Sequence, residues 1–334
     1  MSPNPFNPVT SRTSKTFIRH VAPFAPLALA LAVGAVSSSP QTASKPEVTS
    51  GIVAATCTND ISDFQDCHSR FPTGCSAAAQ YDAYLNFWKN QLIPPETASS
   101  PAKYFTQLAD YQTLDAKIPA GLTQDNQADF QDQLKQFGEG QLYGVIGYLY
   151  YFQHTSAESS NCELTGPPGD PEFSNVDYHI GIGFDPAVAQ QLREGTTASA
   201  APATVAASET AARHNPAKKA RPPSSGSGAS ALQQNSIIVE MTPHDRFQYE
   251  NAIWTLENLQ KAVGKQVKVV GQLLIDNEHN LPSQNCATAS TRNQKRTCWR
   301  ASVWELHPVV TFQVCPNDSC AANSTDWVEL DQLP

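Results

Sequence analysis

The chain has no apolar run long enough to cross a bilayer. Its longest one, FAPLALALAVGAV at residues 24–36, covers about 13 residues, whereas a spanning helix needs roughly 20. Basic residues precede this run and the small residues 35–37 follow it, which is the pattern of a cleavable export signal. We therefore assign residues 1–37 to a signal peptide, with an uncleaved N-terminal anchor as the alternative. We expect the mature protein in the periplasm, in the cell envelope or outside the cell.

Positive charge is also scarce. Lysine and arginine total 22 against 31 aspartates and glutamates, which gives a net charge of −9. Proteins that bind nucleic acid rely on lysine and arginine to neutralise phosphates, so we expect no nucleic-acid partner. One small basic group, Lys218, Lys219 and Arg221, lies in a segment without large apolar residues. The composition indicates no particular cofactor and no other partner.

Two common cysteine and serine motifs are absent. The absence of a C-x-x-C pair disfavours a zinc ribbon, and the absence of a G-x-S-x-G motif disfavours a serine hydrolase. An even number of cysteines, eight, in an exported chain instead favours disulfides. We expect four disulfides that pair within each half of the chain, with Cys286 or Cys298 holding the loop before the last strand. The two sets are Cys57, Cys67, Cys75 and Cys162, and Cys286, Cys298, Cys315 and Cys320.

Two segments have a composition that does not form a core. Residues 38–56 and 196–234 are rich in Ser, Thr, Ala and Pro and contain almost no large apolar side chain. Such segments cannot bury enough surface to offset chain entropy, so we expect both to be disordered. Residues 321–334 are expected to form a C-terminal tail.

The segment 57–137 has a helical pattern with breaks. Tyr81, Leu85 and Trp88 recur at three- and four-residue spacing and mark an apolar stripe along one helix. Similar spacing predicts two more short helices, near residues 104–111 and 130–137. We therefore expect a small helical segment, tied by disulfides, ahead of the main domain.

Strand-like segments dominate the rest of the chain. Five runs of β-branched and aromatic residues are bounded by turn residues: Leu142–Phe152, Val176–Phe184, Ser236–Met241, Val267–Ile275 and Ser302–Val314. A helix is expected at Asn251–Val263, between the third and fourth strands. The order β-β-β-α-β-β, with Gly144 and Gly147 inside the first strand, predicts an α+β fold with a five-stranded OB-like barrel at residues 138–320. A generic α+β sheet with the same order is the alternative.

Carboxylates lie beside imidazoles at three places on or next to these strands. Side chains two apart in a strand share a face, so Glu305 and His307 project together. If the strands are neighbours, up to three imidazoles and four carboxylates converge. The residues concerned are Asp177 with His179, Asp276 with His279, Glu305 with His307, and Glu240.

Two interpretations of this set remain open. In the first, which we favour, it is a hydrogen-bonded network that organises the end of the barrel in a non-enzymatic binding or structural module. In the second, the imidazoles bind the metal of a metal-dependent hydrolase, and a carboxylate acts as general base. The candidate ligands are His179, His279, His307, Asp177 and Asp276, and the candidate bases are Glu240 and Glu305.

The arginines give little support to an OB-fold nuclease. Such enzymes direct arginines at phosphate beside metal-binding carboxylates. Arg246 is alone near the third strand and the helix, and Arg292, Arg296 and Arg300 lie together in a predicted loop. Only the similarity of fold would favour a nuclease.

The first strand is rich in aromatic residues. Strand alternation puts Tyr148 and Tyr150 on one face, and Leu149 and Tyr151 on the other. OB-folds use aromatic faces to stack ligands, and for an acidic chain sugars or peptides fit better than nucleic acid. Core packing accounts for half of these residues without a ligand.

Six segments together resemble a group of exported bacterial proteins. They read GEGQLYGVIGYL, ESSNC at residues 158–162, D-x-H at 177–179, IVEMTP, VVGQLLIDNEH and WELHPV. The group shares a G-x-L strand, an E-S-x-N-C loop, a D-x-H strand, a D-x-x-H turn and an E-[IL]-H-P strand. The resemblance extends over residues 81–314 apart from the insertion, and it implies a shared fold and a shared site. It implies no activity, because none is established for the group.

Overall fold

The computed structural model describes residues 61, 63–75, 79–166, 169–170, 172–195, 230–250, 253–317 and 319–333. All of them belong to one of the two units of the chain, residues 48–334. The predicted signal peptide, residues 38–56 and residues 196–229 of the predicted insertion lie outside the described residues. In the described part of the chain, no helix is both long and apolar enough to cross a membrane.

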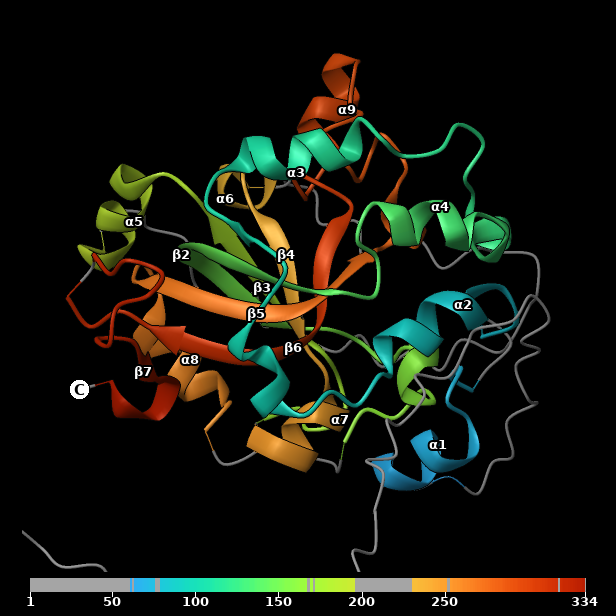
Figure 1. Cartoon of the computed structure of the whole chain (residues 1–334), viewed down its shortest axis with the longest axis horizontal. Coiled ribbons are helices and arrows are strands. Elements are labelled where there is room, and N and C mark those ends of the chain that lie inside the picture. The colour runs from blue at the N-terminus through green and yellow to red at the C-terminus, as the bar shows by residue number, and fades with distance from the viewer. Residues whose placement is uncertain are drawn as a thin grey trace, which may run out of the picture. The chain divides into compact units, whose positions relative to one another are not determined.

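A five-stranded barrel lies at the centre of the fold (Figure 1). Its strands are β2 (Leu142–His154), β3 (Tyr178–Gly183), β4 (Ile237–Met241), β5 (Gln266–Ile275) and β6 (Trp304–Val314). They pair in the order β2–β3–β4–β6–β5, and β5 pairs back with β2 to close the barrel. Only the pairing of β4 with β6 is parallel. With helix α8 (Leu256–Ala262) between β4 and β5, the predicted α+β class and OB-like barrel are confirmed.

The first barrel strand changes partner at one of its glycines. Residues 142–148 of β2 pair with β5, and residues 148–154 pair with β3. Next to this change of partner, a Cβ on Gly147 would lie 2.7 Å from the carbonyl oxygen of Gly183. A side chain is therefore excluded, and the glycine lets the two backbones meet.

Alternation along the strands separates an apolar interior from a polar outer face. Tyr178, Ile180 and Ile182 of β3 point into the core with Val239 of β4 and Leu306 of β6, and all five are fully buried. The residues between them point outward. The acids and imidazoles of β3, β4 and β6 therefore lie on the outside of the barrel.

The N-terminal segment is mainly helical, as the apolar spacing predicts. Its elements are α1 (Phe64–Arg70), α2 (Ala79–Lys89), η1 (Pro95–Ser99), β1 (Tyr104–Phe105), α3 (Leu108–Asp115), η2 (Gln124–Phe130) and α4 (Gln131–Gln136). The short strand β1, which pairs with β2, is not apparent from the sequence. Helix α2 packs on the outside of the barrel, where Leu85 and Trp88 cluster with Leu274 of β5.

Short elements fill the remaining connections. They are η3 (Ser159–Asn161), α5 (Pro186–Arg193), α6 (Ala231–Gln234), α7 (Pro243–Asp245), η4 (Arg246–Glu250), η5 (Asn277–His279), α9 (Arg292–Thr297), β7 (Val328–Glu329) and η6 (Leu330–Gln332). Several boundaries differ from the prediction. The helix expected near residues 104–111 begins at Leu108, because Tyr104 and Phe105 pair with β2 as β1. Ser230 caps α6, so residues 230–234 are not part of a disordered insertion, and Thr255 caps α8, which begins at Leu256. In the predicted tail, β7 pairs with β6 and Leu330 joins the core.

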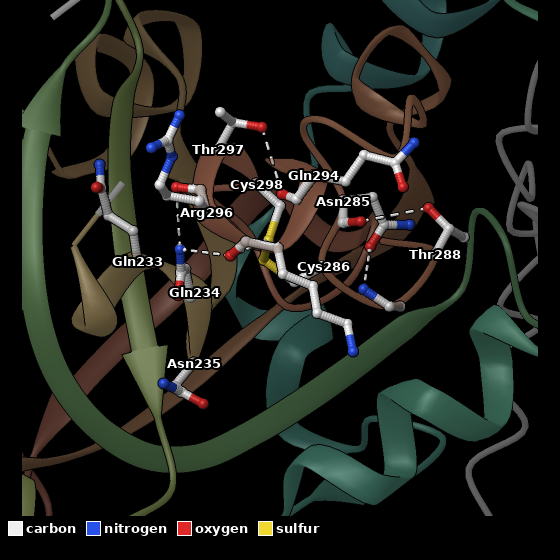
Figure 2. Close-up of a disulfide and its surroundings, with 12 residues drawn as sticks. Gln233, Gln234, Asn235, Asn285, Cys286, Thr288, Gln294, Arg296, Thr297 and Cys298 are labelled. Atoms are coloured by element: carbon white, nitrogen blue, oxygen red, sulfur yellow. Dashed lines mark hydrogen bonds between the residues drawn. A yellow bond between two sulfur atoms is a disulfide. The ribbon is translucent and has the colours of Figure 1, made fainter. Parts of the chain in front are cut away.

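Three disulfides among the described residues join cysteines of the same half, as predicted, and Cys57 lies outside the described residues. Cys67–Cys162 ties α1 to the loop between β2 and β3, Cys286–Cys298 closes the loop before β6, and Cys315–Cys320 closes a short loop after it. Cys75 is also disulfide-bonded. Figure 2 shows the Cys286–Cys298 bridge, near which the side chain of Gln234 in α6 donates to the carbonyl oxygen of Lys295 at 3.0 Å.

Tilted ring contacts join α1 to α7. The ring centroids of His68 and His244 lie 3.9 Å apart, and Phe64 packs on His68 at 4.4 Å. Among the described residues, neither nitrogen of His68 has a hydrogen-bond partner. Burial, and then the charge of His244, lowers the pKa of His68 to about 2, and burial lowers the pKa of His244 to about 4. Both rings are therefore neutral in the folded protein near neutral pH.

We expect acid to destabilise this ring contact. Below about pH 6.5 both histidines bind a proton in the unfolded chain but not in the folded protein. For His244 this difference ends at about pH 4, where the folded protein binds the proton as well. The free energy of unfolding therefore falls as the pH drops, by at most about 1.4 kcal/mol per pH unit for each group. His68→Phe should make the loss between about pH 7 and about pH 4.5 smaller in urea denaturation. His154→Phe is the control, and an unchanged slope in H68F would contradict this account.

Candidate functional site

The predicted carboxylates and imidazoles lie close together on the outside of the barrel. Strands β3, β4, β6 and β5 are consecutive in the sheet, and His179 of β3 is directly opposite Glu240 of β4. On β6, Glu305 and His307 flank the core residue Leu306 and share the outward face. Asp276 directly follows β5. The strand pattern therefore brings the separate pairs into one region.

Seven side chains form an alternating series of acids and bases, which we call the acid–base chain. In order, they are His179, Glu240, His307, Glu305, Arg300, Asp276 and His279. Glu240 Oε1 lies 2.9 Å from His179 Nε2, and Glu240 Oε2 lies 2.9 Å from His307 Nδ1. His307 Nδ1 is also hydrogen-bonded to Glu305 Oε1 at 3.2 Å.

Arg300 links the two parts of the acid–base chain, one ending in Glu305 and the other in Asp276. Its guanidinium donates to Glu305 and to Asp276, and Asp276 Oδ2 lies 2.5 Å from His279 Nδ1. Arg300 is fully buried. Burial alone would lower the pKa of Arg300, but Asp276 and Glu305 outweigh burial and raise it. The guanidinium is therefore charged and shared between two buried carboxylates.

Helix α2 covers the acid–base chain. Its last residue, Lys89, is only 4% exposed, and its Nζ lies 3.6 Å from Glu158 Oε2 in the loop between β2 and β3. The side chain of Gln272 donates to the carbonyl oxygens of Trp88 in α2 and His307 in β6, at 2.9 and 3.1 Å. The Cys67–Cys162 disulfide fastens the same loop to α1. Helix, loop and barrel together therefore close the region.

Mutual pairing favours the charged forms of Glu240 and His307. Burial would raise the pKa of Glu240, but His179 and His307 hold it well below its usual value. Burial would lower the pKa of His307, but Glu240 and Glu305 raise it to about 10. Lys89 behaves in the same way, because the neighbouring acids outweigh burial and raise its pKa. Ion pairs therefore hold this region together.

Asp177, one residue before β3, differs from these paired groups. It is fully buried, and neither of its carboxylate oxygens has a hydrogen-bond partner among the described residues. Burial, followed by the charge of Glu158, raises the pKa of Asp177 to about 7. Together with Glu240 and His307, it forms a group whose potential ligand atoms all lie within 4.8 Å of one another.

The three imidazoles do not meet around one point. In the described part of the chain, two groups of three potential metal ligands occur, and each contains a single imidazole. They are Asp177–Glu240–His307 and Asp276–Glu278–His279. In the second group Arg300 already engages Asp276, and Glu278 is exposed. His179 belongs to neither group and contacts Glu240.

Two cations of the region are not apparent from the sequence. Arg300 shares a predicted loop with Arg292 and Arg296, but the structure buries Arg300 and exposes the other two. Lys89 directly follows the apolar stripe of α2. The predicted set has four carboxylates, and its three imidazoles carry positive charge only when they are protonated. A buried set of this kind needs further cations, and this imbalance is the signal in the sequence that points to them.

A β-bulge at Tyr150 changes the predicted faces of the first strand. Leu149 pairs with Ile182 and Tyr151 with Gly181, so Tyr150 is the extra residue and Tyr151 does not share the face of Leu149. A Cβ on Gly181 would lie 2.1 Å from the ring of Tyr151. The Tyr150 ring covers Gly183 in the same way and is itself buried. These two rings therefore pack on β3, and Tyr150 offers no open stacking surface.

Comparison of the chain with protein-family models, with curated proteins and with solved structures found no match. The OB-like assignment therefore depends on strand order and pairing. The roles of the site residues depend on their geometry, because no relative supplies them.

Removing the cation at the centre of the acid–base chain should destabilise the fold. Arg300→Met keeps most of the side-chain length but leaves Asp276 and Glu305 buried without their shared partner. We expect the free energy of unfolding, measured in guanidinium, to fall by about 3–5 kcal/mol. Arg296→Met on the exposed side of the same loop is the matched control and should change it by less than about 0.5 kcal/mol. Equal effects of the two substitutions would contradict the role given to Arg300.

Proposed function

We propose that the chain is an exported, non-enzymatic binding module built on an OB-like barrel. In this proposal the acid–base chain holds the barrel and its covering helix together and performs no chemistry. The disulfides and the sequence pattern of residues 1–37 support export, because disulfides persist in oxidising compartments. The resemblance to exported bacterial proteins agrees with this.

The burial of the acid–base chain is the observation that carries the proposal. His307, Glu305 and Glu240 are at most 1% exposed. A hydrolytic metal site keeps one position open to water and substrate. A pocket of about 340 Å³ on the barrel has Tyr148 and Gln266 in its wall and includes no member of the acid–base chain.

A metal-dependent hydrolase with His179, His279 and His307 as ligands has less support. His179 and His307 both contact Glu240, whereas His279 contacts Asp276. The acids proposed as general bases, Glu240 and Glu305, are engaged in the same ion pairs. In this arrangement the three imidazoles do not converge on one point, and neither candidate base is free of an ion pair.

The surface that best suits a ligand is the loop closed by Cys286–Cys298. In OB-folds the loop between the last two strands takes part in ligand binding. Here Arg292, Lys295 and Arg296 are exposed on that loop, and residues 280–304 include no acidic residue. Because the chain as a whole is acidic, this concentration of cations favours an acidic ligand. For an exported protein with no other sign of nucleic-acid binding, we propose an acidic polysaccharide.

The covered arrangement predicts how the histidines react with diethyl pyrocarbonate, which modifies accessible imidazoles. The half-buried His154 should react in the folded protein, whereas His179 and His307 should react only after denaturation. His279, with a side chain that is 23% exposed, should be intermediate. Peptide mass spectrometry measures each rate. Labelling of His307 as fast as His154 would mean that the site is open and would argue for an enzyme.

Removing charge from the Cys286–Cys298 loop should weaken polysaccharide binding. We expect the triple variant Arg292→Gln, Lys295→Gln and Arg296→Gln to bind oligogalacturonate about tenfold or more weakly at low salt, with a smaller dependence on salt. Titration calorimetry measures both quantities. The matched control removes the same charge from three exposed lysines elsewhere, Lys103, Lys117 and Lys261. Equal losses in the two variants, or no binding by the unchanged protein, would contradict the proposed ligand surface.

A further inference from the structure

Unpartnered polar atoms gather at three buried side chains. Among the described residues, both oxygens of Asp177, both oxygens of Glu240 and Nε2 of His307 lack a hydrogen-bond partner. The two oxygens of Glu240 still have ion-pair partners, His179 Nε2 and His307 Nδ1, each at 2.9 Å. Of these described atoms, the ones without any polar partner are therefore the two oxygens of Asp177 and Nε2 of His307. Asp177, Glu240 and His307 are each at most 1% exposed. Solvent therefore does not satisfy these atoms from the surface.

These atoms belong to side chains that face one another. One potential ligand atom from each of Asp177, Glu240 and His307 lies within 4.8 Å of the other two. A buried polar atom without a partner costs stability, and a charged one costs more. Folded proteins rarely leave several such atoms together, so their coincidence at one place points to a ligand.

We propose that Asp177, Glu240 and His307 bind one divalent transition-metal ion. Two carboxylates and one imidazole suit Zn²⁺ or Mn²⁺ better than Ca²⁺ or Mg²⁺, for which oxygen ligands are usual. Ligand distances of about 2.0–2.2 Å place donor atoms about 3.5 Å apart around a tetrahedral ion. The three side chains therefore need to approach one another by up to about 1.5 Å.

The surrounding contacts match those of protein metal sites. A metal-binding histidine commonly donates its other ring N–H to a carboxylate, which fixes the tautomer. In His307, Nδ1 is hydrogen-bonded to Glu305 at 3.2 Å and lies 2.9 Å from Glu240 Oε2, and Nε2 is the unpartnered nitrogen. Metal binding therefore requires Glu240 to leave Nδ1 and turn toward the ion. Glu305 is held in turn by Arg300. Glu305, which is outside the proposed ligand set, therefore helps to fix the ring orientation.

The balance of buried charge accommodates a divalent cation. The region contains four carboxylates that are at most 1% exposed and two buried cations. They are Asp177, Glu240, Asp276 and Glu305, and Lys89 and Arg300. Two negative charges are left when the three imidazoles are neutral. His307 must be neutral to bind a metal, so the ion has to displace the proton that Glu240 and Glu305 favour on this ring. One divalent metal ion balances these two negative charges. Protonation of two of the imidazoles would balance them equally and is the competing explanation.

The site is closed, which suits a structural ion rather than a catalytic one. Helix α2 and the loop between β2 and β3 cover it, so substrate has no open route to the ion. With three protein residues as ligands, the second oxygen of a carboxylate or an enclosed water completes the coordination. An ion in such a place enters as the chain folds. The inference goes beyond the proposed function, and its test is separate from histidine labelling and from polysaccharide binding.

Refolding with and without metal tests the inference. The disulfide-intact protein, purified without chelator or histidine tag, is unfolded in guanidinium with EDTA and refolded with Zn²⁺, with Mn²⁺ or with EDTA alone. After desalting, we expect about one equivalent of Zn²⁺ or Mn²⁺ per chain by elemental analysis, and a higher melting temperature than with EDTA. Less than about a tenth of an equivalent with both metals overturns the proposal.

Two substitutions locate the ion. Asp177→Asn keeps the shape of the side chain but removes its charge, and it should lower the bound metal roughly tenfold or more and abolish the metal-dependent rise in melting temperature. Glu278→Gln, in the other acid–imidazole group, is the matched control and should keep the metal content of the unchanged protein. Metal retained in D177N, or lost in E278Q, overturns the assignment.

The melting temperatures of D177N and the unchanged protein distinguish a bound metal ion from protonated imidazoles. If D177N melts higher than the unchanged protein and neither binds metal, imidazolium ions balance the acids and the proposal is wrong. If D177N does not fold, anomalous scattering from crystals of the unchanged protein refolded with Zn²⁺ gives the answer. A peak bonded to Asp177, Glu240 and His307 is expected, and a peak elsewhere, or none, overturns the proposal.

Discussion

The pairing of Arg300 with two buried carboxylates is the interaction on which the rest of the structure depends. Its partners, Asp276 and Glu305, lie at the end of β5 and the start of β6, so the guanidinium fixes these strands where the loop between them begins and ends. Glu305 holds His307, which lies against Glu240 of β4. Desolvation makes buried ion pairs weak net stabilisers, but an unpaired member is costly. We infer that the acid–base chain mainly specifies one arrangement of these strands.

Helix α2 covers the outer face of the barrel that carries the acid–base chain. In OB-folds the second and third strands of the barrel commonly form the ligand face, and here these are β3 and β4. Their outward residues His179 and Glu240 face part of the same chain, with Lys89 of α2 among the charges that act on Glu240. The Cys67–Cys162 disulfide joins the covering segment to the loop between β2 and β3. Because this face is covered, a ligand has better access to the loops than to β3 and β4. This supports the role proposed for the Cys286–Cys298 loop.

Much of the fold can be predicted from local sequence patterns. Runs of β-branched residues mark the five strands, and Gly147 marks the point where the first strand bends. The period of two also predicts that Glu305 and His307 share a face. Other features depend on tertiary contacts. Arg296 and Arg300 lie four residues apart in the same predicted loop, but the structure exposes the first and buries the second. The bulge at Tyr150 likewise depends on the glycines of β3 opposite it, which allow two aromatic rings to lie against the sheet.

A crystal structure of the disulfide-intact protein, grown without chelator, tests the central claim most directly. The claim is that α2 closes the outer face of the barrel over a series of paired charges. The account predicts that α2 lies against β5, that the Lys89 ammonium is buried beside Glu158, and that no solvent-filled cleft leads to His307. A displaced α2 with a water-filled cleft open to His179 and His307 would contradict it and would make a catalytic site the better explanation.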